Sequence, residues 1–145
     1  MNWFEAKDHC LTEGGNLVEI DSKKENTALV KEIKRRGFSD RLFWMGMTDR
    51  GSEGEWILET NGSEPSHLNW GGNGKEPDGG LEENCAVIWN NEDFGGTWSD
   101  VPCDMDDTTV WDNPYKSMHA LCEFQESGDC PPLIIENVTY DMPLK

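Results

Sequence analysis

The sequence predicts a single domain of mixed α+β fold. Two amphipathic helical patterns occupy the first 37 residues, and from Leu42 onward short apolar runs alternate with turn residues, which is typical of small antiparallel sheets. A chain of 145 residues is long enough for one hydrophobic core and short for two. We therefore expect one domain over residues 1–124 and a patternless tail over residues 125–145 that lies outside the fold.

Two helices are predicted at the start of the chain. The first covers residues 2–13, where apolar residues recur at helical spacing before a Gly-Gly pair. After a short strand-like run over residues 17–20, Ser22 and Glu25 form a capping box, in which each side chain can bond a free backbone N–H. The second helix begins there and ends at Gly37, after a basic last turn that favours a helix C-terminus.

Five apolar runs predict the strands: residues 42–47, 54–58, 85–89, 96–98 and 119–124. The second and third runs are separated by residues 59–84, which are rich in Gly, Asn, Pro and Glu and show almost no periodicity. A loop of that length inside a compact domain is usually functional or disordered. Because Trp70 lies within it and Cys85 follows it, we expect this loop to be tied to the core.

The charge is strongly acidic, with 29 Asp and Glu against 12 Lys and Arg and a formal net charge of −17. This balance disfavours a nucleic-acid partner, which needs clustered basic side chains, and suits metal ions or polycations better. No apolar run reaches the roughly 18 residues of a membrane span. A secretion signal would have to precede the printed sequence.

The cysteines indicate an oxidising compartment. The chain has five, none of them in a C-x-x-C pair, and four lie beside apolar or aromatic residues, as buried disulfides do. Two N-x-S/T triplets, at Asn61 and Asn137, also fit a secreted glycoprotein or the ectodomain of a membrane protein. Spacing alone leaves the disulfide pairing open, because any four cysteines allow three connectivities.

Carboxylates crowd the second half of the long loop and the strand after it: Glu76, Asp78, Glu82, Glu83 and Asp100. Such acids repel one another, so either water solvates them separately or a cation holds them together. Calcium takes six to eight oxygen ligands and suits irregular loops of this kind. Pro77 stiffens the link between its two acidic neighbours and can aim both at one ion, more readily if its peptide bond is cis.

A second acidic set follows the strand over residues 42–47. Asp49 and Glu53 are four residues apart in a turn-rich segment and can clamp another ion with help from Glu83 and Asn84. The spacing of an EF-hand loop is not present.

Three motifs carry a resemblance to a known family. Trp44-Met45-Gly46-Met47 resembles the W-I-G-L core strand of the C-type lectin-like domain, Glu76-Pro77-Asp78 looks like its E-P-N or Q-P-D loop motif, and Trp98-Ser99-Asp100 is similar to its W-N-D. The order of helices, long loop and strands agrees. The resemblance covers about residues 1–124 and implies a C-type lectin-like fold with two helices, small antiparallel sheets and a long calcium-binding loop.

The resemblance also implies roles for single residues. Cys10 is expected to pair with Cys122 and Cys85 with Cys103, which leaves Cys130 for a disulfide with a partner chain. The first strand that is usual for the family, which pairs with the last, is expected to be missing from the printed sequence. The implied sugar-site calcium ligands are Glu76, Asp78, Glu83, Ser99 and Asp100. The implied auxiliary-site ligands are Asp49, Glu53, Glu83 and Asn84.

The chain departs from the family pattern at the sugar site. Ser99 replaces a longer Asn that binds both calcium and sugar, and Gly79 stands where related auxiliary sites often have an acid. Glu76 and Asp78 are both hydrogen-bond acceptors when ionised, so the usual code leaves mannose-type and galactose-type sugars undecided. Trp111, in a long segment between two cysteines, is expected to add to the sugar contacts.

The function expected from these residues is calcium-dependent binding of glycans or glycoproteins outside the cell. The alternative is a calcium-stabilised protein-interaction module that binds no sugar. An enzyme is not expected: Glu76 and Glu83 resemble the carboxylate pair of a glycoside hydrolase, but calcium would hold them as ligands, and no G-x-S-x-G motif or Cys/His nucleophile setting is present.

Overall fold

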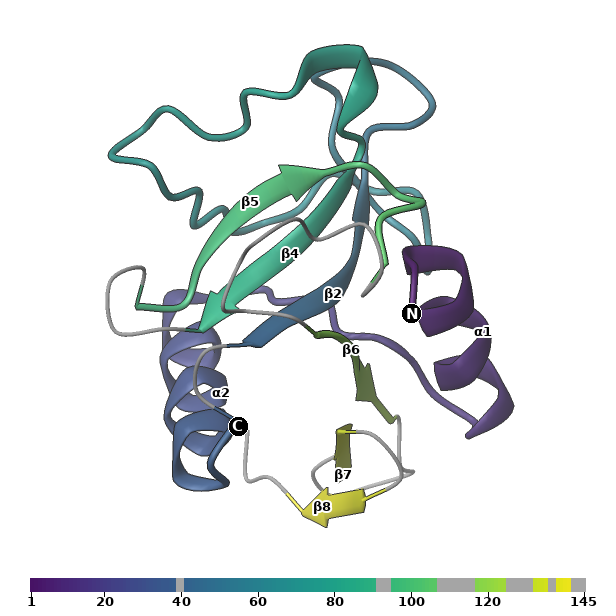
Figure 1. Ribbon diagram of the computed structural model, residues 1–145, viewed down its shortest axis with the longest axis vertical. Coiled ribbons are helices and arrows are strands. Elements are labelled where there is room, and N and C mark those ends of the chain that lie inside the picture. Colours follow the sequence, from purple (N-terminus) through teal and green to yellow (C-terminus); the bar gives the residue numbers. More distant parts are fainter. Residues whose placement is uncertain (39–40, 91–94, 107–116, 125–131, 136–137, 142–145) are drawn as a thin grey trace.

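A computed structural model describes residues 1–38, 41–90, 95–106 and 117–124, and the backbone of strands 132–135 and 138–141 (Figure 1). Its elements in chain order are α1 (Trp3–Thr12), β1 (Asn16–Leu17), α2 (Lys23–Arg35), β2 (Arg41–Thr48), β3 (Ile57–Leu58), the 3₁₀ helix η1 (Gly80–Glu82), β4 (Cys85–Asn90), β5 (Thr97–Val101), β6 (Met118–Glu123), β7 (Pro132–Ile135) and β8 (Val138–Asp141). Two helices and a mixed sheet confirm the α+β fold class.

Each helix begins at a side chain that satisfies a free backbone N–H. Asn2 and Glu5 form a reciprocal capping box at the start of α1, with bonds of 3.0 and 2.9 Å. At α2 the Ser22 hydroxyl accepts from the Glu25 N–H, as predicted, but the Glu25 carboxylate accepts from the N–H of Asp21 instead of Ser22. Both helix starts are therefore fixed by local sequence.

The strands form one sheet in the order β5-β4-β2-β6-β7-β8, with β1 added beside β6 and β3 beside β2. The pairs β2–β4 and β4–β5 are antiparallel, as expected, but β2 and β6 run parallel. The expectation of antiparallel sheets alone is therefore wrong for this pair. Parallel neighbours need a long crossover, and the chain between β2 and β6 supplies one of many tens of residues.

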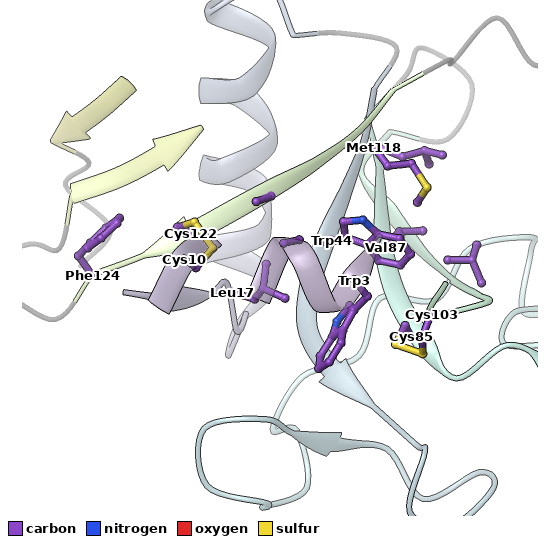
Figure 2. Close-up of a cluster of buried hydrophobic side chains, with 14 residues drawn as sticks. Trp3, Cys10, Leu17, Trp44, Cys85, Val87, Cys103, Met118, Cys122 and Phe124 are labelled. Carbon is purple, nitrogen blue, oxygen red and sulfur yellow. A yellow bond between two sulfur atoms is a disulfide. The ribbon is translucent and has the colours of Figure 1, made fainter. Parts of the chain in front are cut away.

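The core lies on both faces of β2, because successive side chains of a strand point to opposite sides. Trp44 joins a cluster with Trp3 that also contains both disulfides, Cys10–Cys122 and Cys85–Cys103 (Figure 2). Phe43 joins a second cluster, which contains Trp98 and the apolar face of α2. The disulfide pairing is the one that the family resemblance implies.

Buried indole groups also bond across elements. The Trp3 ring N–H donates to the Met45 carbonyl at 2.9 Å, and the Trp98 ring N–H donates to the Asn26 side chain at 2.8 Å. A buried tryptophan needs such a partner for its one polar atom. These two bonds attach α1 to β2 and α2 to β5.

The strands β7 and β8 were not predicted from the sequence pattern. The Val18 N–H bonds the Leu121 carbonyl and the Gly46 N–H bonds the Val18 carbonyl, so the chain after β1 lies between β6 and β2. The other edge of β6 pairs with β7, with Leu121 opposite Ile135. The strands β7 and β8 thus extend the sheet, so the expectation that the tail lies outside the fold is wrong for these two strands. The domain boundary at residue 124 stays a prediction.

Candidate functional site

The long loop between β3 and β4 is attached to the core near its middle. Trp70 forms an isolated bridge with Trp98, flanked by bonds from the Gly71 N–H to the Trp98 carbonyl at 2.8 Å and from the Trp98 N–H to the Asn69 carbonyl at 2.9 Å. The Trp70 ring lies 4.8 Å from the ring of Trp56, centroid to centroid. Trp70 is therefore a packing residue that anchors the loop, as expected for a loop tied to the core.

Beyond this anchor the loop brings three predicted ligands together. One carboxylate oxygen each from Glu76, Asp78 and Asp100 lies within 4.8 Å of the others. The Glu76–Pro77 peptide bond between two of these acids is cis. The long loop and η1 lie beyond the ends of β4 and β5, at the top of Figure 1.

Asp100 connects the two halves of this cluster. It lies on β5 with only 4% of its surface exposed, and its two carboxylate oxygens accept hydrogen bonds from the backbone N–H groups of Asp78 and Gly79, each at 3.0 Å. A carboxylate held in this way is positioned before any ligand arrives. No local sequence pattern predicts that the Gly79 backbone N–H donates to Asp100.

The Glu83 side chain packs directly against the backbone of residue 79, and it can do so because that residue is glycine. A Cβ atom built on Gly79 would lie 2.2 Å from the Cβ of Glu83, so only glycine allows this approach. Burial raises the pKa of the Glu83 carboxyl, with further contributions from the negative charges of Asp100 and Asp78. The glycine that departs from the family pattern thus has a structural reason here.

The cluster carries uncompensated negative charge. Burial, a hydrogen bond with Asp100 and repulsion from Asp78, Asp100 and Glu83 raise the pKa of the Glu76 carboxyl to about 7. Every charge that acts on Glu76 in this way belongs to another acid. A bound cation would remove that repulsion, and an all-oxygen donor set with no Cys or His suits calcium.

Asp49 is the centre of the second predicted set. It is 3% exposed, its Oδ2 accepts from the Gly54 N–H at 2.9 Å, and its backbone N–H donates to the Asn84 carbonyl at 3.3 Å. Within the described residues, its buried Oδ1 has no hydrogen-bond partner. A buried carboxylate oxygen normally has one, so this atom fits a cation ligand.

The pKa values of Asp49 and Glu53 are also consistent with a cation site. Burial raises the pKa of Asp49, and repulsion from Asp100 adds to the rise. Partial desolvation and the charge of Asp49 raise the pKa of the exposed Glu53. The Asn84 side-chain amide donates to the Leu81 carbonyl at 2.9 Å and thereby holds η1 against the start of β4.

The remaining predicted residues are Ser99, Trp111 and Cys130. Ser99 is half-buried on β5, between Trp98 and Asp100 and opposite Val87. Its role as a ligand stays a prediction. Trp111 and Cys130 lie outside the described residues.

Known proteins resemble this chain in sequence and in fold. The family model of the lectin C-type domain matches residues 1–110. A perlucin-like protein of Mytilus galloprovincialis is 32% identical over 105 residues, which cover 72% of this chain and 65% of that protein. The chain spans about half to two thirds of the curated relatives it matches.

Solved structures also resemble this chain in fold. The carbohydrate-recognition domain of the mouse scavenger receptor C-type lectin matches with a TM-score of 0.58 and 28% identity, over 72% of this chain and 73% of that one. Herring type II antifreeze protein matches with a TM-score of 0.58 and 28% identity, over 71% of this chain and 75% of that one. With the motifs, the fold and both disulfides in place, the chain belongs to the C-type lectin domain family.

Proposed function

We propose that this domain binds glycans through calcium held by Glu76, Asp78, Glu83, Ser99 and Asp100. As a C-type lectin domain the chain is a binding module and not an enzyme. The observation that carries the proposal is the convergence of three carboxylates from a loop and a strand, within 4.8 Å of one another. Without a cation, the mutual repulsion of these groups opposes the arrangement that the fold imposes.

The residues suggest how a sugar would be held. Calcium supplies the positive charge that draws hydroxyl oxygens of the ligand, and ionised Glu76 and Asp78 can each accept a hydrogen bond from those hydroxyls. Ser99 can donate one in return. Because both flanking side chains are acceptors, the sugar class stays open between mannose-type and galactose-type ligands.

The second candidate is a calcium-stabilised protein-interaction module. Herring type II antifreeze protein has the same fold, so the fold does not by itself define a carbohydrate ligand. In that case calcium would order the loop around Asp100 and the partner would be a protein. The auxiliary set around Asp49 would serve the same ordering role in either case.

We also place the protein outside the cell. Two disulfides close within the chain, and bonds of this kind persist in oxidising compartments. The structure shows no helix, among the residues that it describes, with the length and apolar character needed to span a bilayer. A disulfide through Cys130 to a second chain stays a prediction, which a non-reducing gel can test.

The deciding experiment is retention on mannose and galactose resins with calcium and release by EDTA. Glu83→Ala should abolish both calcium binding and retention, while Glu82→Ala, which removes an exposed neighbouring acid, should leave both intact. Retention that survives Glu83→Ala would refute the site assignment. A melting temperature raised by calcium without retention on any sugar resin would favour the protein-interaction module.

A further inference from the structure

The N-x-S triplet at Asn61 forms the tip of a turn that directly follows β3. The Gly62 N–H bonds the Leu58 carbonyl and the Leu58 N–H bonds the Ser63 carbonyl, both at 2.8 Å. Gly62 has φ +70°, a conformation that glycine adopts without strain. All three residues of the triplet are exposed, so the turn presents the triplet to solvent.

The side chain of Asn61 is already oriented within this turn. Its Oδ1 accepts a hydrogen bond from the Ser63 backbone N–H at 2.9 Å. Because Oδ1 faces the turn, the amide nitrogen Nδ2 on the other side of the group is directed away from it. The triplet also satisfies the sequence rule, since Gly62 is not proline, and the following residue, Glu64, is not proline either.

Residues just before the triplet hold the turn on the body of the domain. Thr60 donates from its N–H and its hydroxyl to the Glu19 carboxylate, at 2.8 and 2.7 Å. Glu59 forms an ion pair with Lys7 of α1 at 2.8 Å. The base of the turn is therefore fixed while its tip is exposed to solvent, which leaves room for a bulky group on Asn61.

From these observations we propose that Asn61 carries an N-linked glycan. In this modification, Nδ2 bonds the anomeric carbon of an oligosaccharide and loses a proton, which passes to solvent. The bond from that carbon to a lipid diphosphate breaks, and the diphosphate leaves with the electron pair of that bond. The donor is a lipid-linked oligosaccharide diphosphate, and neither partner is oxidised or reduced.

The modification does not depend on the proposed calcium site. The turn contacts α1 and the segment after β1, through Lys7 and Glu19, whereas the carboxylate cluster lies at β5 and the loop before β4. A glycan on Asn61 should therefore leave sugar and calcium binding at that cluster unchanged. It would instead cover the neighbouring groove between α1 and this turn, which the exposed Leu11 lines.

The test is expression of the whole chain behind a secretion leader in insect or mammalian cells. Peptide mapping of the secreted protein should find the Asn61 peptide glycosylated, and peptide N-glycosidase F should convert Asn61 to Asp and raise the gel mobility. Asn61→Gln and Ser63→Ala should each remove that glycan and its mobility shift. Ser63→Thr, which keeps a hydroxyl, should retain it.

Variants of the second triplet serve as the matched control. Asn137→Gln leaves the Asn61 peptide unaltered, so a mobility shift that survives in this variant belongs to Asn61. An unmodified Asn61 peptide in secreted wild-type protein would overturn the proposal. Calcium binding measured on the same samples is a separate readout. A wild-type protein that binds no calcium would refute the proposed function and would leave the glycan proposal unaffected.

Discussion

Glu123 is a half-buried acid whose protonation is expected to affect the stability of the fold. It lies on β6, opposite Asn16 of β1, and its surroundings are acidic. Burial raises the pKa of the Glu123 carboxyl to about 8 from its usual 4.5, and repulsion from Glu19, Glu25 and Asp21 adds to the rise. A hydrogen bond from the Glu19 backbone N–H opposes it in part.

The sign of the effect follows from proton binding. The folded chain binds the proton of the Glu123 carboxyl more tightly than the unfolded chain does. This proton therefore makes its full contribution to the free energy of unfolding below about pH 4.5, and the contribution is lost as the pH rises through about 8. At about 1.36 kcal/mol for each pH unit, the loss across that interval is roughly 4–5 kcal/mol. Glu123→Gln, which stays neutral, should remove this pH dependence.

The assay is urea unfolding of wild type and Glu123→Gln at about pH 5 and about pH 9, with EDTA present throughout. The variant should be close to wild type at the lower pH and more stable by several kcal/mol at the higher one. Glu13→Gln, an exposed change at the end of α1, is the matched control and should follow wild type at both values.

The reasoning would be refuted if Glu123→Gln and wild type lost the same stability between the two pH values. Other acids, Glu76 among them, contribute to the wild-type pH dependence, so the difference between the two proteins is the quantity that matters. A direct measurement is NMR titration of the Glu123 carboxyl, which should show a midpoint several pH units above that of a free glutamate.

Three further changes test other parts of the structure. Gly96→Ala places a Cβ 2.1 Å from the Val30 Cγ2 at φ +82° and should lower the free energy of unfolding by roughly 1–3 kcal/mol; an unchanged urea midpoint would contradict this packing. Replacing both Cys85 and Cys103 by Ala removes a link between residues 18 apart in the chain and should lower the free energy of unfolding by about 3 kcal/mol in the same assay. Asp49→Asn should remove one bound calcium in calorimetric titration, and an unaltered stoichiometry would remove Asp49 from the ligand set.

Features with a local signal could be predicted from the sequence. The second helix was predicted to begin at Ser22 because capping depends on neighbours in the chain, and α2 does begin there. The family motifs placed Glu76, Asp78 and Asp100, and the structure brings their carboxylates together. The α+β class and the family are confirmed.

Features that depend on distant parts of the chain could not be predicted. The parallel pairing of β2 with β6 depends on the path of the long connection between the two strands, and the local sequence of β6 does not encode it. The unpartnered Oδ1 of Asp49 and the approach of Glu83 to Gly79 likewise arise only when separate segments meet. The same holds for β7, whose pairing with β6 has no signal in the local sequence.

The two hydrogen bonds that the Asp100 carboxylate accepts also make the loop observable in solution. An amide hydrogen exchanges with water when its bond opens, so the exchange rates of the Asp78 and Gly79 amides report how often the loop leaves β5. These two adjacent amides lie within the candidate site itself. Their protection, followed by NMR or mass spectrometry during a calcium titration, would record the response of the loop residue by residue, with no sugar or partner protein added.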